Sequence, residues 1–270
     1  MRSGLLAAVL LLGACSTCRE PGPGPVTRGL LDLSDEARRA GVAPAGLASH
    51  QATLGRLASM ARETRARIER GQHPVDALNH VVFEVRRFRR DVKDLSLESA
   101  LLGRVLARRR GSCMGLGGLY LALGESLELP LGGVLVPGHF LVRHAGTRDV
   151  ELLKRGRRMP RAWYRERYPV PERSTLYLRT LAAGESLAVF RYNLANELRA
   201  RGRRRAALGH YRRVVATLPA FAEAWANLGL TLQELGRPAE AERAYLEARA
   251  ANPRLEGLEH NLRVLRSRQP

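Results

Sequence analysis

The chain has 270 residues, of which 45% are hydrophobic, and a formal net charge of +19. This length suits two domains, and the apolar content is enough to bury their cores. The positive charge comes almost entirely from arginine, because Lys93 and Lys154 are the only lysines. The arginines are spread over every segment and accompany no DNA- or RNA-binding signature. We therefore expect no nucleic-acid partner, and attraction to anionic lipid head groups instead.

The N-terminal segment has the pattern of an export signal. A short positive start is followed by an apolar run that cannot span a bilayer, because spanning needs about 20 apolar residues. The segment from Leu12 to Cys15 resembles the lipobox of bacterial lipoproteins. The resemblance implies a signal peptide at 1–14 that is removed and a lipid on Cys15; an ordinary secretory signal that contains a cysteine is the alternative.

Two further features of this segment bear on location. Ser16 resembles the residue found after the cysteine in lipoproteins that are passed to the outer membrane. Residues 15–33 begin with the lipidated cysteine and contain alternating proline and glycine, which predicts a stiff, solvated tether. We therefore expect a protein of the bacterial cell envelope, anchored in the outer membrane and facing the periplasm.

The next segment, 34–185, is predicted to form one domain in which helices precede a small sheet. Apolar residues recur at three- and four-residue spacing from 34 to 110, with a helix boundary at Gly71 to Pro74 and another helix start at Ser96. A further helix is expected from Cys113 to Leu127. After it come β-rich runs at 133–136, 139–143 and 149–153, separated by turn residues.

Within this domain, one cysteine stands where chemistry is favourable. Cys113 opens a helix, whose unpaired N–H groups and dipole favour a thiolate. His139 begins a strand after a tight turn and is the candidate general base and acid. Glu151 and Asp149 are the candidates for the group that orients the imidazole. If the hairpin closes through residues 145–147, Glu151 lies diagonal to His139 on the same face and is preferred.

From about residue 186 the chain repeats itself with a period of 34. Asparagine recurs at 193, 227 and 261, and the matched columns include glycine at 202 and 236, tyrosine at 211 and 245, and proline at 219 and 253. This period and these residues are the tetratricopeptide (TPR) signature. Residues 186–270 are therefore predicted to contain two TPR repeats, 186–219 and 220–253, and a capping helix. Such an array either packs on the first domain or docks a protein partner.

Several segments together resemble the transglutaminase-like domain of SirB1-type proteins: Leu78 to Phe83, Glu98 to Leu102, Val105 to Cys113, Leu119-Tyr120 and Leu135 to Arg143. The resemblance covers about residues 50–180. It implies an α+β, papain-like transglutaminase core with helices packed on a small antiparallel sheet, and a triad of Cys113, His139 and an acid. Many SirB1-type proteins carry proline at the position where this chain carries Cys113.

These observations predict a membrane-anchored cysteine enzyme, a protease, amidase or acyl transferase, that acts on an amide or peptide bond of an envelope protein. The competing interpretation is a non-catalytic envelope adaptor, in which the same fold and the repeats form a protein-binding scaffold. In that case Cys113 is a small core residue and His139 a hydrogen-bonded one. The remaining histidines have no metal-ligand spacing, so we expect neither a metal nor a cofactor.

Overall fold

The computed structural model describes residues 22–91, 96–172 and 174–267. The predicted Cys15 anchor and the signal peptide lie outside these residues. The longer helices are α1 (Pro25–Arg39), α2 (His50–Glu69), α5 (Cys113–Ser126), α7 (Ala183–Ala200), α8 (Arg204–Thr217), α9 (Ala222–Glu234) and α10 (Pro238–Ala251). Shorter helices are α3 (Pro74–Asn79), α4 (Leu102–Arg108), α6 (Arg161–Arg167), α11 (Leu258–Arg266), the π-helix η1 (His80–Val85), and the 3-10 turns η2 (Leu97–Ser99) and η3 (Leu152–Lys154).

One four-stranded antiparallel sheet forms the β part of the first domain. Its strand order is β5 (Arg148–Val150), β4 (His139–His144), β3 (Leu131–Val136) and β6 (Thr180–Leu181). Strands β3 and β4 join through a two-residue turn in which Gly138 adopts a φ of 71°, a conformation that favours glycine. A separate parallel pair joins β1 (Arg89–Arg90) to β2 (Arg110–Gly111) and was not predicted from the sequence.

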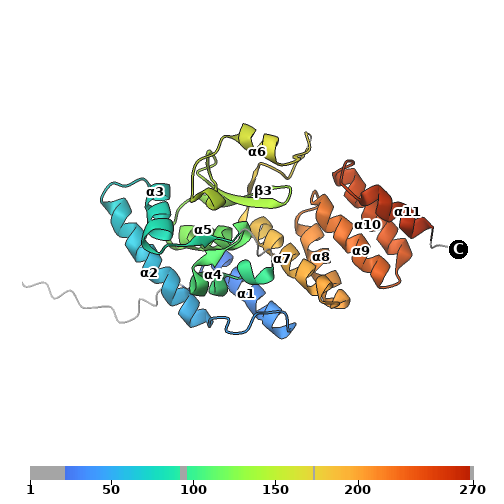
Figure 1. The fold of residues 1–270 in the computed structure, drawn as a ribbon, viewed down its shortest axis with the longest axis horizontal. Coiled ribbons are helices and arrows are strands. Elements are labelled where there is room, and N and C mark those ends of the chain that lie inside the picture. Colours follow the sequence, from blue (N-terminus) through green and yellow to red (C-terminus); the bar gives the residue numbers. More distant parts are fainter. Residues whose placement is uncertain (1–21, 92–95, 173, 268–270) are drawn as a thin grey trace, which may run out of the picture.

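Helix α5 is the centre of the domain. Its buried residues run without a break from Met114 to Gly124, so the helix is covered on all sides. Strands β3 and β4 pack on one side of it, and helices α1, α2 and α4 pack on the other, as Figure 1 shows. Gly117 lies directly under the ring of Phe140, where a Cβ atom would overlap that ring. The glycines of α5 thus permit the close approach of helix and sheet.

The tether predicted from the sequence is shorter than 15–33. Residues 25–33 form the first turns of α1, which packs on α5 and α7. Val26, Leu30 and Leu33 are buried in the main core. The side chain of Glu125 on α5 accepts hydrogen bonds from the backbone N–H groups of Val26 and Thr27 at 2.9 Å. Proline at the first helical position favours a helix start, so the Pro/Gly segment ends at Gly24.

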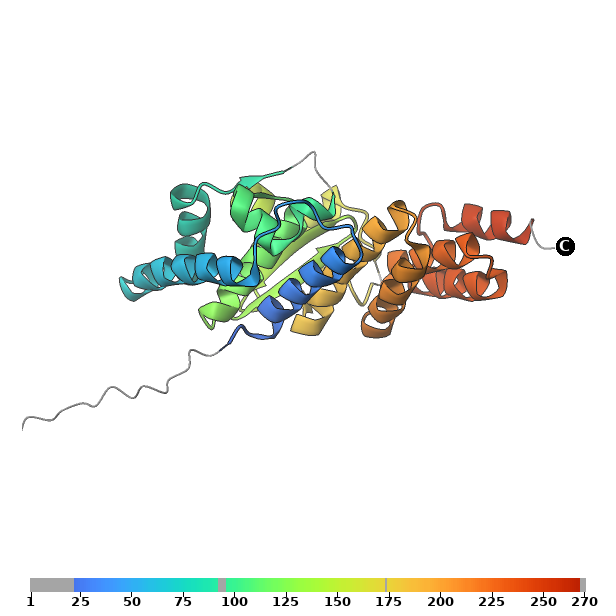
Figure 2. The same ribbon diagram turned by 90° about the horizontal axis from the view of Figure 1, so that it is seen from below.

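The C-terminal part is an array of antiparallel helices that extends away from the sheet (Figure 1). Helices α7 and α8 form one pair, α9 and α10 form the next, and α11 packs on the end. Tyr245, one of the matched positions, lies fully buried against Gly229 in the core of its repeat. Helix α7 also packs on α1, β3 and β6, which joins the array to the first domain. Figure 2 shows the same elongated arrangement from below.

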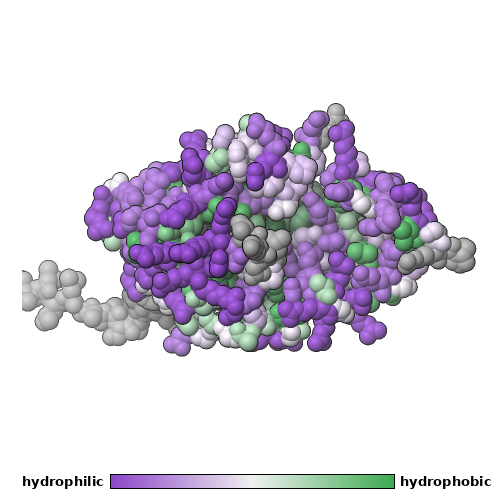
Figure 3. Space-filling model, in the orientation of Figure 1, coloured by the Kyte–Doolittle hydropathy of each residue, from purple (hydrophilic) through white to green (hydrophobic). Residues whose placement is uncertain are grey.

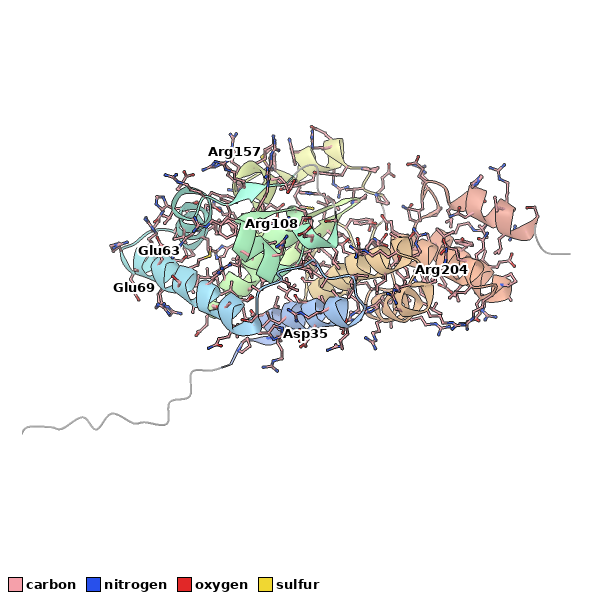
Figure 4. The ribbon with its side chains drawn as sticks, turned by 60° about the horizontal axis from the view of Figure 1, so that its bottom comes forward. Asp35, Glu63, Glu69, Arg108, Arg157 and Arg204 are labelled. Atoms are coloured by element: carbon pink, nitrogen blue, oxygen red, sulfur yellow. The ribbon has the colours of Figure 1, made fainter. Side chains whose placement is uncertain are left out.

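The surface is strongly charged around both parts. The face in Figure 3 is mostly hydrophilic. Figure 4 shows charged side chains projecting outward along the chain, among them Glu63 and Glu69 from α2, Arg108 from α4 and Arg204 from α8. Several of these charges are paired: Arg108 with Glu98, for example, and Arg204 with Glu234. No helix in the described part of the chain is long and apolar enough to cross a membrane.

Candidate active site

Cys113 is the first residue of α5, and the preceding residues hold this helix start in place. The side chain of Ser112 caps the helix by accepting a hydrogen bond from the backbone N–H of Gly115 at 3.3 Å. The backbone and hydroxyl of Ser112 both donate to the carbonyl of Ser99. Cys113 itself is half-buried. The thiol therefore sits at the positive end of a well-anchored helix, where a negative charge is stabilised.

His139 is the first residue of β4 and pairs across the β3–β4 turn with Val136. Its side chain is only 3% exposed, and its Nε2 lies 2.8 Å from Oε2 of Glu151, which is 1% exposed. The second carboxylate oxygen of Glu151 accepts a hydrogen bond from the backbone N–H of Leu153 at 3.0 Å. Both oxygens of Glu151 are thus used, and the carboxylate is held in one orientation toward the imidazole.

The Cys113 side chain completes the surroundings of the imidazole. Burial lowers the pKa of His139, but hydrogen bonds to Cys113 and Glu151, together with the negative charges of these two residues, raise it to about 9. Nε2 of His139 faces Glu151, and Cys113 and His139 line the same cavity. This order of groups, thiol to imidazole to carboxylate, is the one that a nucleophilic cysteine needs.

The register of the β4–β5 hairpin explains the choice of carboxylate. Arg143 pairs with Asp149 and His144 with Arg148, so the turn consists of residues 145–147, as the preferred alternative required. Asp149 does not reach His139. It forms a buried ion pair with Arg143, which also donates to the carbonyl of Leu178. The structure therefore brings Glu151 to His139 and gives Asp149 a different partner.

Two tyrosines that the sequence analysis did not assign to the site enclose the His139–Glu151 pair. Tyr168 stacks on the imidazole with ring centroids 5.0 Å apart and an interplanar angle of 2°. Tyr164 is fully buried beside Glu151, and burial together with the nearby carboxylates raises its pKa well above its ordinary value. The spacing of Tyr164 in the sequence does not predict its contact with Glu151, because the backbone between the sheet and α6 is irregular.

A cavity of about 450 Å³ opens in front of Cys113 and His139. One wall comes from the β3–β4 turn and the start of α5. The opposite wall comes from Tyr177 and from the first helices of the two repeats, with Tyr192, Asn196 and Glu223 among its residues. The repeat array therefore forms part of the wall around the candidate nucleophile. No group of three or more His, Cys, Asp or Glu side chains that could hold a metal occurs among the described residues.

Comparison with known proteins identifies two parts of the chain. Residues 49–168 match the family described as the Transglutaminase-like superfamily, and residues 222–255 match the tetratricopeptide repeat. The chain contains a transglutaminase-like domain and a TPR repeat. Over 159 residues it is also 35% identical to a UPF0162 protein of Pseudomonas aeruginosa; the aligned part is 57% of this chain and 58% of that protein.

The matches confirm the predicted fold class, a transglutaminase-like α+β domain followed by a helical TPR region. The transglutaminase-like match ends at Tyr168, the residue that stacks on His139. It contains Cys113, His139 and Glu151. The TPR match covers α9 and α10, and α7 and α8 precede it with the same helix–turn–helix arrangement and the same 34-residue spacing.

Proposed function

We propose that the protein is a membrane-anchored cysteine enzyme that acts on an amide or peptide bond, with Cys113 as nucleophile, His139 as general acid and base, and Glu151 as the group that orients His139. The observation that carries this proposal is the 2.8 Å contact between Glu151 and His139, because His139 lines the same cavity as Cys113. The matched transglutaminase-like domain supports it, because it spans all three residues.

In this mechanism the Cys113 thiolate attacks the carbonyl carbon of the substrate amide. The carbonyl oxygen becomes an oxyanion, and the C–N bond then breaks as the imidazolium of His139 donates its proton to the leaving amine. The product of this half-reaction is a thioester on Cys113. Water or a second amine then attacks the thioester while His139 accepts its proton, which completes hydrolysis or acyl transfer. Glu151 keeps its negative charge throughout and stabilises the imidazolium.

The test is the rate at which iodoacetamide modifies Cys113 as a function of pH. A cysteine ion-paired with His139 should be alkylated rapidly at mildly acidic pH, and His139→Ala should abolish that rate below pH 7. Modification at Cys113 is followed by mass spectrometry of its peptide, so that Cys18 does not contribute. Equal alkylation rates of Cys113 in the intact protein and in His139→Ala would contradict the proposed enzyme activity. The protein would then be an adaptor built on the same fold.

The proposal includes a location at the bacterial envelope. A lipid on Cys15 would hold the chain in the outer membrane, and the short Pro/Gly segment would separate α1 from the bilayer. A cluster of exposed arginines on and beside the β1–β2 pair would add attraction to anionic head groups, about 1 kcal/mol for each basic residue near the surface. These residues are Arg87, Arg89, Arg90, Arg108, Arg109 and Arg110.

The anchor is tested separately from the chemistry. Cys15→Ala should move the protein from the membrane fraction to the soluble fraction, whereas Cys18→Ala should leave it in the membrane fraction. The repeats support docking of a protein partner, since the TPR match points to protein–protein interaction in general. A pull-down from envelope extracts should recover that partner with the intact chain and lose it when α9 to α11 are deleted.

A further inference from the structure

The charge of the cavity in front of Cys113 differs from the charge of the whole chain. The chain has 45 Lys and Arg residues against 26 Asp and Glu residues. Among the described residues that line the cavity there is no lysine or arginine, but there are two glutamates, Glu197 and Glu223. The one other charged group is the imidazole of His139, which is paired with Glu151. In a strongly positive protein, the described lining of this cavity thus contains acidic side chains and no lysine or arginine.

Glu223 is the carboxylate with the least compensation. It lies in the first turn of α9, and the hydroxyl of Tyr177 donates to it at 2.5 Å. It forms no ion pair with any residue that the structure describes. By contrast, Glu197 is paired at 2.6 Å with Arg201, which follows the last residue of α7. On the wall of the cavity, Glu223 therefore has the Tyr177 hydroxyl and the start of α9 as polar neighbours, but no cationic side chain among the described residues.

Burial makes this charge costly. Loss of water raises the pKa of Glu223, and the hydrogen bond from Tyr177 opposes the rise. A partly buried carboxylate is stabilised most by a cation that enters the same low-dielectric space, since the interaction between the two charges is stronger there than in water. The aromatic rings of Tyr177 and Tyr192 line the cavity beside Glu223 and add a surface that favours a cation.

We infer that this cavity binds a positively charged amino or guanidino group of the substrate, with Glu223 of the repeat array as its counter-charge. This inference rests on the proposal that Cys113 acts on a substrate in the cavity. It makes the array a specificity-determining part of the active site: α5 and β4 supply the reacting groups, and α9 selects a peptide with a lysine or arginine side chain near the amide that is attacked.

The inference is tested with two thiol reagents of similar size and opposite charge. These are the trimethylammonioethyl and sulfonatoethyl methanethiosulfonates, and each rate at Cys113 is divided by the rate with a free small thiol. The cationic reagent should react faster than the anionic one in the full-length protein. Glu223→Gln keeps an acceptor for Tyr177 but removes the charge, and should lower the ratio of the two rates by about fivefold.

The matched control is Glu247→Gln, which makes the same charge change at an exposed position of α10 away from the cavity. This variant should leave the ratio unchanged. An equal ratio in the intact protein and in Glu223→Gln, or an equal fall in both variants, would overturn the inference. Failure of both reagents to reach Cys113 would overturn it as well.

A second measurement uses a substrate-like probe. Nα-acetyl-lysine methylamide should slow the alkylation of Cys113 by neutral iodoacetamide, whereas the uncharged norleucine analogue should not, and Glu223→Gln should remove the difference. Protection that is equal for the two probes would count against a cationic site. The outcome is separable from the chemistry: if His139→Ala is alkylated at the intact rate while the charge ratio still depends on Glu223, the enzyme proposal fails and the cation site stands.

Discussion

Tyr168 lies flat on His139, with the two ring centroids 5.0 Å apart and the planes within 2° of parallel. The imidazole of His139 therefore has Tyr168 on one face and Glu151 at Nε2. It also forms a hydrogen bond with the side chain of Cys113. Its side chain is almost completely shielded from solvent. An imidazole held by so many neighbours has little freedom to rotate, and a fixed ring is what proton transfer to and from one sulfur atom requires.

Removing the stacked ring should loosen the imidazole. We expect Tyr168→Ala to lower the alkylation rate of Cys113 at pH 6 by about two- to tenfold, the equivalent of one aromatic pair. Tyr168→Phe retains the ring and should keep the rate of the intact protein. The measurement is the iodoacetamide rate at fixed pH. A rate that stays the same in Tyr168→Ala would mean that Glu151 alone orients the ring.

Stability should decrease as the pH rises from 6.5 to 9. Because the pKa of His139 is raised from 6.5 to about 9 on folding, the folded protein holds this proton more tightly than the unfolded chain. The contribution of protonated His139 to the free energy of unfolding is therefore fully present below pH 6.5 and is lost as the pH rises through 9. At about 1.4 kcal/mol per pH unit, it amounts to about 3 kcal/mol. Urea unfolding at several pH values should show this loss in the intact protein, and a flatter profile in His139→Gln.

The buried ion pair between Arg143 and Asp149 should be structural. Asp149→Asn would leave the guanidinium buried without its carboxylate, and should lower the free energy of unfolding by about 3–5 kcal/mol. The double variant Arg143→Met, Asp149→Leu removes both charges and should recover much of this loss. Thermal unfolding measures both effects. If Asp149→Asn instead changed the alkylation of Cys113 without changing stability, Asp149 would have to act on the site.

Two glycines provide a matched test of the helix start at Cys113. A Cβ atom on Gly115 would overlap the carbonyl oxygen of Ser99, whereas a Cβ atom on Gly209, in α8, would meet nothing within 4 Å. Gly115→Ala should therefore destabilise the protein by more than about 2 kcal/mol and displace Cys113. Gly209→Ala should be neutral or stabilising by up to about 1 kcal/mol, because alanine favours the helix. Thermal unfolding of the two variants measures both effects. Equal stabilities of Gly115→Ala and Gly209→Ala would contradict the prediction.

Local elements, and contacts that follow from a simple strand register, are predictable from the sequence. The 34-residue period located the repeats. The preference for Glu151 over Asp149 depended on a turn at 145–147, and the structure has that turn. Periods of two and of about 3.6 residues are set by the backbone, so they can be read from the chain.

The surroundings of these residues are visible only in the folded chain. The tertiary structure moved residues 25–33 from the tether into the core, stacked Tyr168 on His139, and brought Glu223 of α9 to the cavity that Cys113 lines. Each of these contacts joins segments far apart in the chain or reached through irregular backbone. Such contacts depend on how whole elements pack, and packing is decided by the combined shape of many side chains rather than by any repeating pattern.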